Sequence, residues 1–347
     1  VALTLSAQRG FSQGALVVRD QNPAAGRDGA PAIWVSGLRG GEEVLLSYEA
    51  EARVRGDHAL AAVEVVCTDP LGFFVRRRRL ACENHLLVLP RYEGVSLLPV
   101  NGRRRNYLVG VERSTVEGEG QEFFGIREYR HGDSMRHVHW CSTARVGSPM
   151  VRQFENETQP NIALFVDTAF DGMHARARRF QLDRCAAVAS SLALYVLNAG
   201  SRISCAAAGQ TVGGLELKGG EDHRYRVLRF LASLQPVRSM SRADALADAI
   251  VRLTGGEVLV AILASLDGST VATFSAFANR GGVAVVFLVA PGDEEEEGEE
   301  ESDEPLPGRS ALEGFRGYAQ GLKAIGIPVV PVGDEGTLDR AIRAWLR

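Results

Sequence analysis

The stretch GEGQEFFGIREYRHGDSMRHVHWCSTAR occupies residues 118–145, and the run MVRQFE follows at residues 150–155. We call residues 118–155 the signature segment. It is dense in arginines, acids and aromatic residues, and it follows neither the two-residue period of a strand nor the 3.6-residue period of a helix throughout. An apolar run at residues 162–166 comes next. The segment therefore predicts an irregular connection that leads into a buried strand.

Residues 1–90 predict an antiparallel β-sandwich. Short apolar or alternating runs are separated by Gly, Pro, Asn and Asp, and no helical period occurs among them. The chain begins with Val1 rather than Met and its strand pattern starts at once, so we expect a sandwich that is truncated at its N-terminus. The expected strands lie at residues 2–5, 15–18, 44–48, 60–67, 72–75 and 86–89.

Residues 161–347 predict a domain in which strands and helices alternate. This alternation is typical of a doubly wound, mostly parallel sheet with helices on both faces, whose sites lie at the carboxyl ends of the strands. Gly200 is expected to end the first helix. The chain thus divides into a sandwich domain at residues 1–90, a signature linker at residues 91–160 that packs on the next domain, and an α/β domain at residues 161–347. The expected strands of this last domain lie at 162–166, 202–208, 211–217, 258–264, 283–289 and 327–331, and its helices at 178–198, 222–234, 241–253, 269–279, 309–325 and 336–346.

The signature segment resembles that of a bacterial family known as domain of unknown function 58. That family carries the pattern G-x-x-F-x-x-x-R-E-Y-x-x-G-D-x-x-R-x-I-x-W-x-x-x-A-R ahead of a von Willebrand factor A-like domain. Val138 stands where the pattern has Ile, and Arg55-Gly56 and residues 69–74 resemble two further elements of the family. The matching residues are Gly120, Phe123, Arg127, Glu128, Tyr129, Gly132, Asp133, Arg136, Trp140, Ala144 and Arg145.

The resemblance implies a fold and a role. The α/β domain would be a von Willebrand factor A-like Rossmannoid domain, and the protein would be a scaffold rather than an enzyme of defined chemistry. Relatives usually carry two membrane helices ahead of this point, and they are often encoded near MoxR-type AAA+ ATPases. The resemblance therefore implies a cytoplasmic protein, anchored at the inner membrane through a segment absent from this chain, with such an ATPase as its partner.

The charge of the chain is distributed unevenly. Residues 293–304 hold 10 acids and no bases, so the formal net charge of −4 becomes +6 without them. A run of this kind repels itself and buries nothing, which predicts a disordered surface loop; a docking segment for a basic partner is the alternative. Basic runs lie at residues 76–79 and 103–105. The first predicts either a solvated edge strand or a patch for an acidic partner or lipid head groups, and neither run has the interleaved aromatic residues of a nucleic-acid site.

Several classes of protein are excluded by composition. The five cysteines are odd in number and share no C-x-x-C spacing, which argues against a disulfide framework and a zinc ribbon and indicates a reducing compartment. No run approaches the roughly 20 apolar residues of a membrane helix, and no signal peptide is visible.

The loop after the first α/β strand is a candidate metal site. In von Willebrand factor A-like domains this loop reads D-x-S-x-S and helps to hold a hard divalent cation through oxygen ligands. Here Asp167 is kept, Ala169 replaces the first Ser and Asp171 replaces the second, while Asp267 is placed to supply a later acid. We expect a degenerate site. No cofactor is needed, and an ion that did bind would be Mg²⁺ or Ca²⁺.

A second candidate group lies in the signature segment. His131, His137 and His139 lie near Cys141, a set that admits a metal site or a thiol nucleophile. No compact fourth ligand accompanies them. Polar surface or core packing is therefore the simpler interpretation.

The charged residues of the signature segment have two interpretations. Arginine forks pair with carboxylates, so Arg127, Glu128, Asp133, Arg136 and Arg145 either lock the segment against the α/β domain or form a recognition surface. In both cases Tyr129 and Trp140 would be apolar anchors.

We therefore expect a non-enzymatic adaptor that binds protein partners and no nucleic acid. The alternative is a metal-dependent binding domain or hydrolase that uses Asp167 or Cys141.

Overall fold

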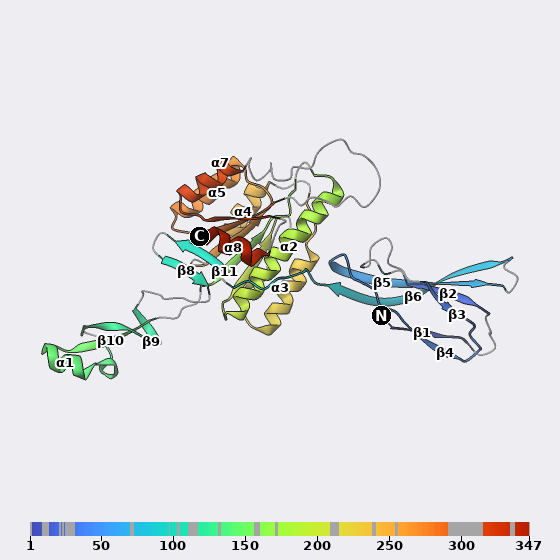
Figure 1. The fold of residues 1–347 in the computed structure, drawn as a ribbon, viewed down its shortest axis with the longest axis horizontal. Helices are drawn as coiled ribbons and strands as arrows, with labels where there is room; N and C mark the ends of the chain where they lie inside the picture. The colour runs from blue at the N-terminus through green and yellow to red at the C-terminus, as the bar shows by residue number, and fades with distance from the viewer. Residues whose placement is uncertain are drawn as a thin grey trace. The chain divides into compact units, whose positions relative to one another are not determined.

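The computed structural model of the chain contains two compact units (Figure 1). One comprises Val1–Arg91 with Tyr225–Gln235, and the other comprises Tyr92–Arg224 with Pro236–Arg347. Each has its own hydrophobic core. The acidic run at residues 293–304, expected to be a disordered loop, lies outside the described residues. The structure describes residues 2–8, 14–20, 22, 24, 32–69, 73–96, 98–102, 105–109, 117–130, 133–155, 160–170, 173–208, 215–237, 241–253, 256–290, 315–333 and 337–346.

The first unit contains two antiparallel sheets. One pairs β1 with β4, and the other has the order β3-β2-β5-β6, so β6 lies at its edge. Side chains at alternate strand positions face inward and form a core around Leu16, Val18, Val63 and Val65. The strands are β1 (Ala2–Ser6), β2 (Leu16–Asp20), β3 (Ala32–Val35), β4 (Glu43–Ser47), β5 (Gly56–Thr68) and β6 (Val75–Val88).

A buried polar pair belongs to this unit. Asp20 is buried at the end of β2, and the Tyr48 hydroxyl donates a hydrogen bond to its carboxylate. Burial raises the pKa of Tyr48, and the hydrogen bond to Asp20 adds to the rise. Tyr48 therefore remains a neutral donor that satisfies the buried acid.

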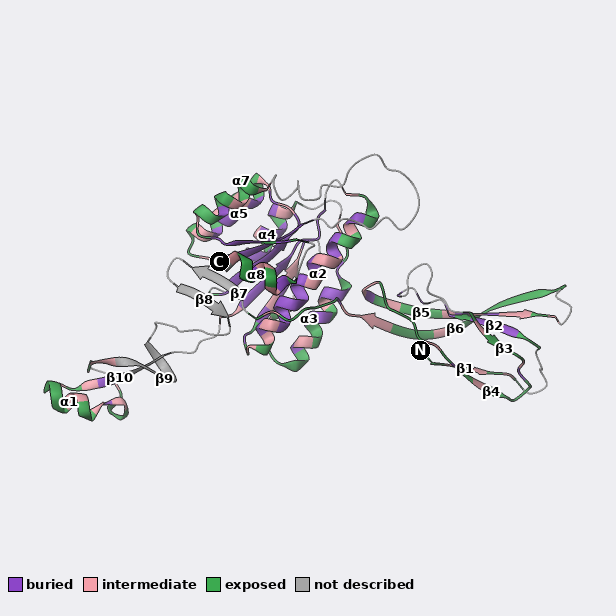
Figure 2. Cartoon of the chain, viewed as in Figure 1, coloured by how far each residue is buried: buried purple, intermediate pink, exposed green. Residues whose placement is uncertain are grey.

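The edge of the larger sheet differs from the sequence prediction. Instead of short strands at residues 72–75 and 86–89, one 14-residue strand, β6, runs through the arginines between them, and β3 is a strand that the pattern does not predict. All four arginines at residues 76–79 are exposed (Figure 2). Because β6 is an edge strand without a covered face at this point, charge is tolerated on both of its sides. The alternation rule did not predict the length of β6, because that rule presumes one buried face. The edge position and the exposure of its arginines agree with the solvated edge strand that was one of the two predictions for residues 76–79.

The second unit is built on a six-stranded sheet in the order β13-β12-β11-β14-β15-β16. Five strands are parallel, and the edge strand β13 is antiparallel to β12. The chain moves from β11 to β12 on one side and later reaches β14 on the other side, so the winding reverses between β11 and β14. The strands are β11 (Ile162–Val166), β12 (Ile203–Ala207), β13 (Leu215–Lys218), β14 (Val258–Leu263), β15 (Val283–Val289) and β16 (Val329–Val332). The helices along residues 161–347 are α2 (Ala175–Asn198), α3 (Glu221–Ser233), α4 (Arg242–Val251), α5 (Gly268–Asn279), α7 (Arg316–Ala324) and α8 (Leu338–Leu346). Helix α3 belongs to the first unit from Tyr225 onward, and the other five belong to the second.

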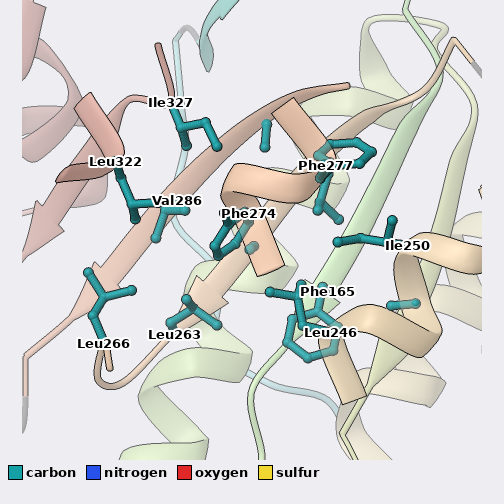
Figure 3. Close-up of a cluster of buried hydrophobic side chains, with 14 of the residues drawn as sticks. Phe165, Leu246, Ile250, Leu263, Leu266, Phe274, Phe277, Val286, Leu322 and Ile327 are labelled. Atoms are coloured by element: carbon teal, nitrogen blue, oxygen red, sulfur yellow. The ribbon is translucent and has the colours of Figure 1, made fainter. Parts of the chain in front are cut away.

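The core of the second unit lies on both faces of this sheet. On one face a single cluster contains Phe165 of β11, Leu246 of α4, Phe274 of α5 and Leu322 of α7 (Figure 3). These side chains are at most 1% exposed, and each stabilises the fold by about 1.5–3 kcal/mol relative to exposure to water. Helix α2 contacts β11 and β14, whose remaining side chains are also buried. The predicted α/β alternation is therefore present.

Helix α2 is a core helix of this unit. Among the described residues it is the one helix long and apolar enough to cross a membrane by length and composition, and 67% of its apolar window is buried inside the structure. It ends where the sequence predicts, since Gly200 follows its last turn with φ +80°. That left-handed conformation is the one in which glycine carries no Cβ penalty.

The signature segment forms a hairpin with an insertion. Strands β9 (Glu117–Glu128) and β10 (Met150–Glu155) pair antiparallel, and a 3-10 turn η2 (Met135–His137) and helix α1 (Trp140–Val146) lie between them. The expectation of an irregular connection is therefore wrong for the two ends of the segment, which form the paired strands β9 and β10. The hairpin escapes sequence reasoning because a long insertion replaces the short turn that normally marks paired strands. A second hairpin pairs β7 (Leu98–Gly102) with β8 (Arg105–Val109).

Residues 92–96 are fastened to two helices of the second unit. The Glu93 N–H donates to Ser191 Oγ on α2 over 2.8 Å, and the Glu93 carboxylate accepts from the Leu338 N–H at the start of α8 over 3.0 Å. The Ser96 N–H donates to the Asp339 carboxylate over 2.8 Å. Hydrogen bonds from Ser96, assisted by Arg343, hold the pKa of Asp339 below its usual range.

Candidate functional site

Two acids follow two adjacent strands at the carboxyl edge of the parallel sheet. Asp167 comes directly after β11, and Asp267 caps the N-terminus of α5 shortly after β14. Strands β11 and β14 are hydrogen-bonded neighbours between which the winding reverses. In doubly wound sheets the loops diverge at this point and leave room for a ligand. The sequence predicted that both acids lie at this edge of the sheet. In the structure both accept hydrogen bonds from the same side chain.

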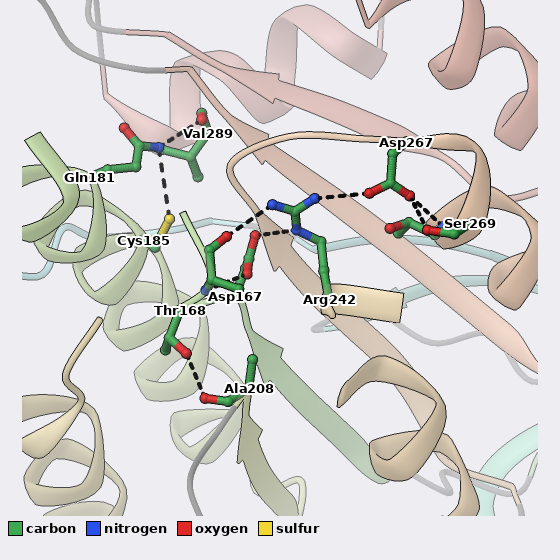
Figure 4. A network of polar contacts seen from close by, with 11 residues as sticks. Asp167, Thr168, Gln181, Cys185, Ala208, Arg242, Asp267, Ser269 and Val289 are labelled. Carbon is green, nitrogen blue, oxygen red and sulfur yellow. Dashed lines mark hydrogen bonds and ion pairs between the residues drawn. The ribbon is translucent and has the colours of Figure 1, made fainter. Parts of the chain in front are cut away.

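That side chain is Arg242, the first residue of α4 (Figure 4). Its Nε donates to Asp167 Oδ2 over 2.6 Å, and its Nη1 donates to Asp267 Oδ2 over 3.3 Å. Its Nη2 donates to the Ala169 carbonyl oxygen over 3.0 Å. The Arg242 side chain is 9% exposed and that of Asp167 is fully buried. All three nitrogens of the guanidinium therefore hold the ends of the two central strands together.

The remaining carboxylate oxygens are bonded within their own loops. Asp167 Oδ1 accepts from the Ala169 N–H over 2.9 Å. Asp267 Oδ1 accepts from Ser269 Oγ over 2.6 Å and from the Thr270 N–H over 2.7 Å, which are the bonds of a helix N-cap. The Asp167 loop is fixed further by the Val237 N–H, which donates to the Thr168 carbonyl oxygen over 2.9 Å.

The two carboxyl groups lie in different electrostatic environments. Burial raises the pKa of Asp167, and the Arg242 charge together with the Ala169 N–H opposes that rise. Asp267 is less buried. Burial again disfavours its charge, but bonds from Ser269 and Thr270 and the Arg242 charge hold its pKa below the usual range. The charged form of Asp167 therefore depends on Arg242 more than that of Asp267 does, because a buried carboxylate without a partner is costly.

The residues in this arrangement do not fit a divalent cation. Such an ion needs several free oxygens at about 2.0–2.6 Å, and here a guanidinium already contacts both acids. Ala169 has no ligating atom, and Asp171 lies outside the described residues. Across the described part of the chain, no three His, Cys, Asp or Glu side chains lie close enough to hold a metal. Among the described residues, Arg242 therefore occupies the position between Asp167 and Asp267 that a bound cation would need.

Sequence reasoning missed Arg242, although the sequence contains a signal for it. A cation in the first turn of a helix is disfavoured by the helix dipole, which presents partial positive charge there. Arg242 directly follows the N-cap Ser241, so it needs compensation from acids elsewhere in the fold. Two acids after neighbouring strands supply that compensation.

The signature segment carries a second ion pair. Arg127 of β9 donates to both carboxylate oxygens of Asp133, over 2.6 and 2.8 Å, and the Arg130 N–H donates to the same carboxylate over 2.7 Å. The hydrogen bond from Arg127, followed by that from Arg130, lowers the pKa of Asp133 to about 2. Both members of the pair belong to the segment itself, so the described contacts of Asp133 brace the end of β9.

The histidine nearest Cys141 caps a helix. His139 Nδ1 accepts from the Ser142 N–H over 3.3 Å and lies 2.8 Å from Ser142 Oγ. The Thr143 hydroxyl donates to the His139 carbonyl oxygen over 3.1 Å. Cys141 itself is exposed, and His131 lies outside the described residues. These contacts assign His139 a local structural role at the start of α1.

Other signature residues lie at the surface. Trp140 is 66% exposed, Met135 is 64% exposed and Val146 is 60% exposed. Arg136 and Arg145 are exposed beside them. Of the remaining expected site residues, Glu128 is exposed, Tyr129 is partly buried, Gly120 and Phe123 lie in β9 with no side chain described, and Gly132 lies outside the described residues.

A cavity of about 250 Å³ lies away from the carboxyl edge, beside β11, β12, β13 and α4. Its lining includes Phe165, Cys205 and Leu253, and its charged members are Glu216, Arg252 and Glu257. Burial raises the pKa of the Cys205 thiol far above its usual value. That thiol is therefore protonated and unreactive at neutral pH.

Comparisons with known proteins agree with the sequence pattern. Residues 125–296 match the family model described as "Protein of unknown function DUF58". The chain is 25% identical over 236 residues to the uncharacterized protein YeaD of Bacillus subtilis (strain 168), a match that covers 67% of this chain and 57% of that protein. It is 26% identical over 148 residues to the uncharacterized protein Rv1480 of Mycobacterium tuberculosis, a match that covers 42% of this chain and 47% of that protein.

The chain thus spans about half the length of the curated relatives it matches. Among solved structures, an aerotolerance-related membrane protein from Bacteroides fragilis NCTC 9343 aligns with a TM-score of 0.37 and 16% identity. That alignment covers 54% of this chain and 98% of the other.

Proposed function

We propose that this protein is a non-enzymatic adaptor whose signature segment binds a protein partner. The observation that carries the proposal is the combination of Trp140, Met135 and Val146, all exposed, on a segment whose backbone is braced by the Arg127–Asp133 pair. A braced segment loses little conformational entropy on binding, so exposed apolar side chains on it contribute most of their burial energy to the complex.

The chemistry of this surface suits a protein partner. Tryptophan and arginine dominate the binding energy of protein interfaces, and here Trp140 is flanked along the chain by exposed Arg136 and Arg145. Large exposed apolar side chains gathered on a short segment are typical of interaction sites. The Arg127–Asp133 pair braces the segment itself, and its described contacts do not reach the α/β domain. Arg136 and Arg145 are exposed, which supports the interpretation of a recognition surface.

The second unit is proposed to be a von Willebrand factor A-like domain that works without metal. The strand order, the single antiparallel edge strand and the acid after β11 support this assignment. The Arg242 bridge between Asp167 and Asp267 supports metal independence, because one guanidinium already pairs with both acids.

The partner we propose is a MoxR-type AAA+ ATPase, which is the class that the signature resemblance implies. The corresponding location is the cytoplasmic face of the inner membrane. The exposed arginines of the signature segment would then meet an acidic, partly apolar surface on the ATPase.

Binding between the purified chain and the MoxR-type ATPases of its own genome tests this proposal. Trp140→Ala should weaken binding at least tenfold, as expected for an interface tryptophan. Trp34→Ala is the matched control, because Trp34 is 76% exposed but lies in β3 of the first unit. Absence of binding to every such ATPase, or equal affinity of the Trp140 variant and the wild type, would contradict the proposal.

A further inference from the structure

The hairpin between β5 and β6 ends in an apolar tip. Strand β5 ends at Thr68 and β6 begins at Val75, and the two strands pair along their length. The Asp69 N–H donates to the Phe74 carbonyl oxygen over 3.1 Å, and the Phe74 N–H donates to the Asp69 carboxylate. These two bonds tie Phe74, next to the start of β6, to Asp69, the residue that follows β5.

The aromatic side chains of this tip are exposed. Phe73 is 77% exposed, Phe74 is 76% exposed and the adjacent Val75 is 57% exposed. No other pair of consecutive residues among the described parts of the chain exposes two large aromatic side chains to this extent. Exposure of two neighbouring phenylalanines is unfavourable in water and calls for an apolar environment in function.

Four arginines follow the tip directly. Residues 76–79 are all exposed, and the cross-strand register places Arg76 opposite Cys67 and Arg78 opposite Val65. Arg77 and Arg79 therefore point to the other face of the strand. Positive charge thus surrounds the strand behind the tip on both faces, within a few residues of the aromatic pair.

We propose that this tip docks on a bilayer surface rich in anionic phospholipid, with Phe73 and Phe74 entering the interface and the arginines contacting lipid phosphates. Aromatic rings are favoured at the level of the head groups, and each basic residue near an anionic leaflet strengthens binding by roughly fivefold. The order of residues along the chain matches the layers of a membrane surface. The phenylalanines would lie at the deeper, apolar level, and the arginines that follow them would lie at the level of the phosphates.

The order of the exposed residues favours a bilayer over other occupants. Two exposed phenylalanines are followed within two residues by four exposed arginines, which matches an apolar layer bordered by a layer of anionic phosphates. A bilayer offers both layers and needs no complementary pocket. A nucleic acid would use the same arginines, so it is a separate outcome of the test.

Vesicle co-sedimentation of the purified chain tests the proposal. The chain should bind vesicles that contain phosphatidylglycerol at least tenfold more tightly than vesicles of phosphatidylcholine alone, and added salt should weaken that binding. Phe73→Ser/Phe74→Ser and, separately, Arg76→Gln/Arg77→Gln should each reduce binding at least fivefold. All four positions are exposed, so both variants should fold like the wild type, as circular dichroism can verify.

Matched control variants distinguish binding through the tip from binding through exposed aromatic or basic residues elsewhere on the protein. Trp34→Ser removes an equally exposed aromatic residue, and Arg179→Gln/Arg226→Gln removes two exposed arginines elsewhere; both should bind vesicles like the wild type. In a Phe74→Trp variant, brominated acyl chains should quench fluorescence beyond the level seen in the wild type. Equal loss of binding in the control variants, absence of quenching, or tighter binding to single-stranded or double-stranded DNA than to anionic vesicles would overturn the proposal.

Discussion

Arg242 Nε lies 2.6 Å from Asp167 Oδ2 at the carboxyl edge of the parallel sheet. The cation that faces this buried acid is therefore a side chain of the protein. The same guanidinium reaches Asp267 and the Ala169 carbonyl oxygen, which ties the ends of β11 and β14 through one side chain.

Removal of Arg242 should destabilise the second unit strongly. Arg242→Ala leaves the buried Asp167 carboxylate without its cation, and loss of one member of a buried ion pair costs about 3–5 kcal/mol. Arg242→Lys keeps the charge but cannot reach three acceptors at once, so its loss should be smaller. Hydrogen exchange of the β11 and β14 amides measures both effects. Arg179→Ala, at an exposed position of α2, should change the free energy by less than about 0.5 kcal/mol; a similar small change for Arg242→Ala would refute the bridge.

Divalent cations should leave the wild-type melting temperature unchanged. Arg242 occupies the space between Asp167 and Asp267, and a second cation there would be repelled. Arg242→Ser removes that obstacle and leaves two acids facing each other, so Mn²⁺ should bind this variant and raise its melting temperature. Isothermal titration calorimetry measures the binding, with Arg242→Ser/Asp167→Asn as the control that should lose it. Tight Mg²⁺ or Ca²⁺ binding by the wild type that disappears in Asp167→Asn would restore the metal-dependent alternative.

The signature ion pair should be visible as a shifted titration. The pKa of Asp133 should be about 2 in the folded chain, against an ordinary value of 3.8. Because the folded pKa is depressed, the stabilisation is present above about pH 4 and is lost as the pH falls from about 4 toward 2. Carboxyl carbon NMR titration measures the value. Arg127→Ala should move it back toward 3.8, and an unshifted Asp133 in the wild type would show that the pair does not form in solution.

Asp133→Ala should loosen the signature segment. The variant removes the acceptor of both Arg127 and the Arg130 N–H, so the end of β9 loses its brace. Limited proteolysis between β9 and α1 should become faster, while cleavage within the first unit stays the same. Unchanged proteolysis at both places would mean that the segment is held by other contacts.

Two glycines with equally open surroundings should respond oppositely to alanine. A Cβ at Gly200 or at Gly317 would meet no atom within 4 Å, but only Gly200 has a positive φ, +80°. Gly200→Ala should therefore cost about 1–2 kcal/mol through backbone strain. Gly317→Ala, inside α7, should stabilise by about 0.5–1 kcal/mol because alanine is the better helix former. Urea unfolding of the two variants compares them, and effects of equal sign would contradict this account.

The α/β part of the fold was predictable because its signals are local and redundant. Strand Ile162–Val166 is an uninterrupted apolar run, and the helix that ends before Gly200 shows both periodicity and a stop signal. Each such element is specified by its own residues. The order of the strands in the sheet is determined instead by packing between segments that are distant in the sequence. The alternation of strands and helices predicts a mostly parallel sheet but not the order of its strands.

The elements that escaped prediction depend on context beyond the local sequence. The solvated edge expected at residues 76–79 is present, but the full length of β6 was not predicted, because four consecutive arginines are compatible with a strand interior only at the edge of a sheet. The β9–β10 hairpin joins residues on either side of a helical insertion. In the candidate site, Asp167 and Asp267 were predictable from their positions after strands. The role of Arg242 was not, because it depends on where the first turn of α4 meets the edge of the sheet.

The double attachment of Glu93 has a mechanical consequence. This residue links the side of α2 to the first turn of α8, so tension applied along the chain ahead of Tyr92 enters the second unit through two helices rather than through the signature hairpin. A motor that pulled on that part of the chain would load α8, a nine-residue helix, before it loaded any strand of the central sheet. In a single-molecule pulling experiment, Glu93→Ala should lower the force of the first rupture while leaving the later, sheet-borne rupture unchanged.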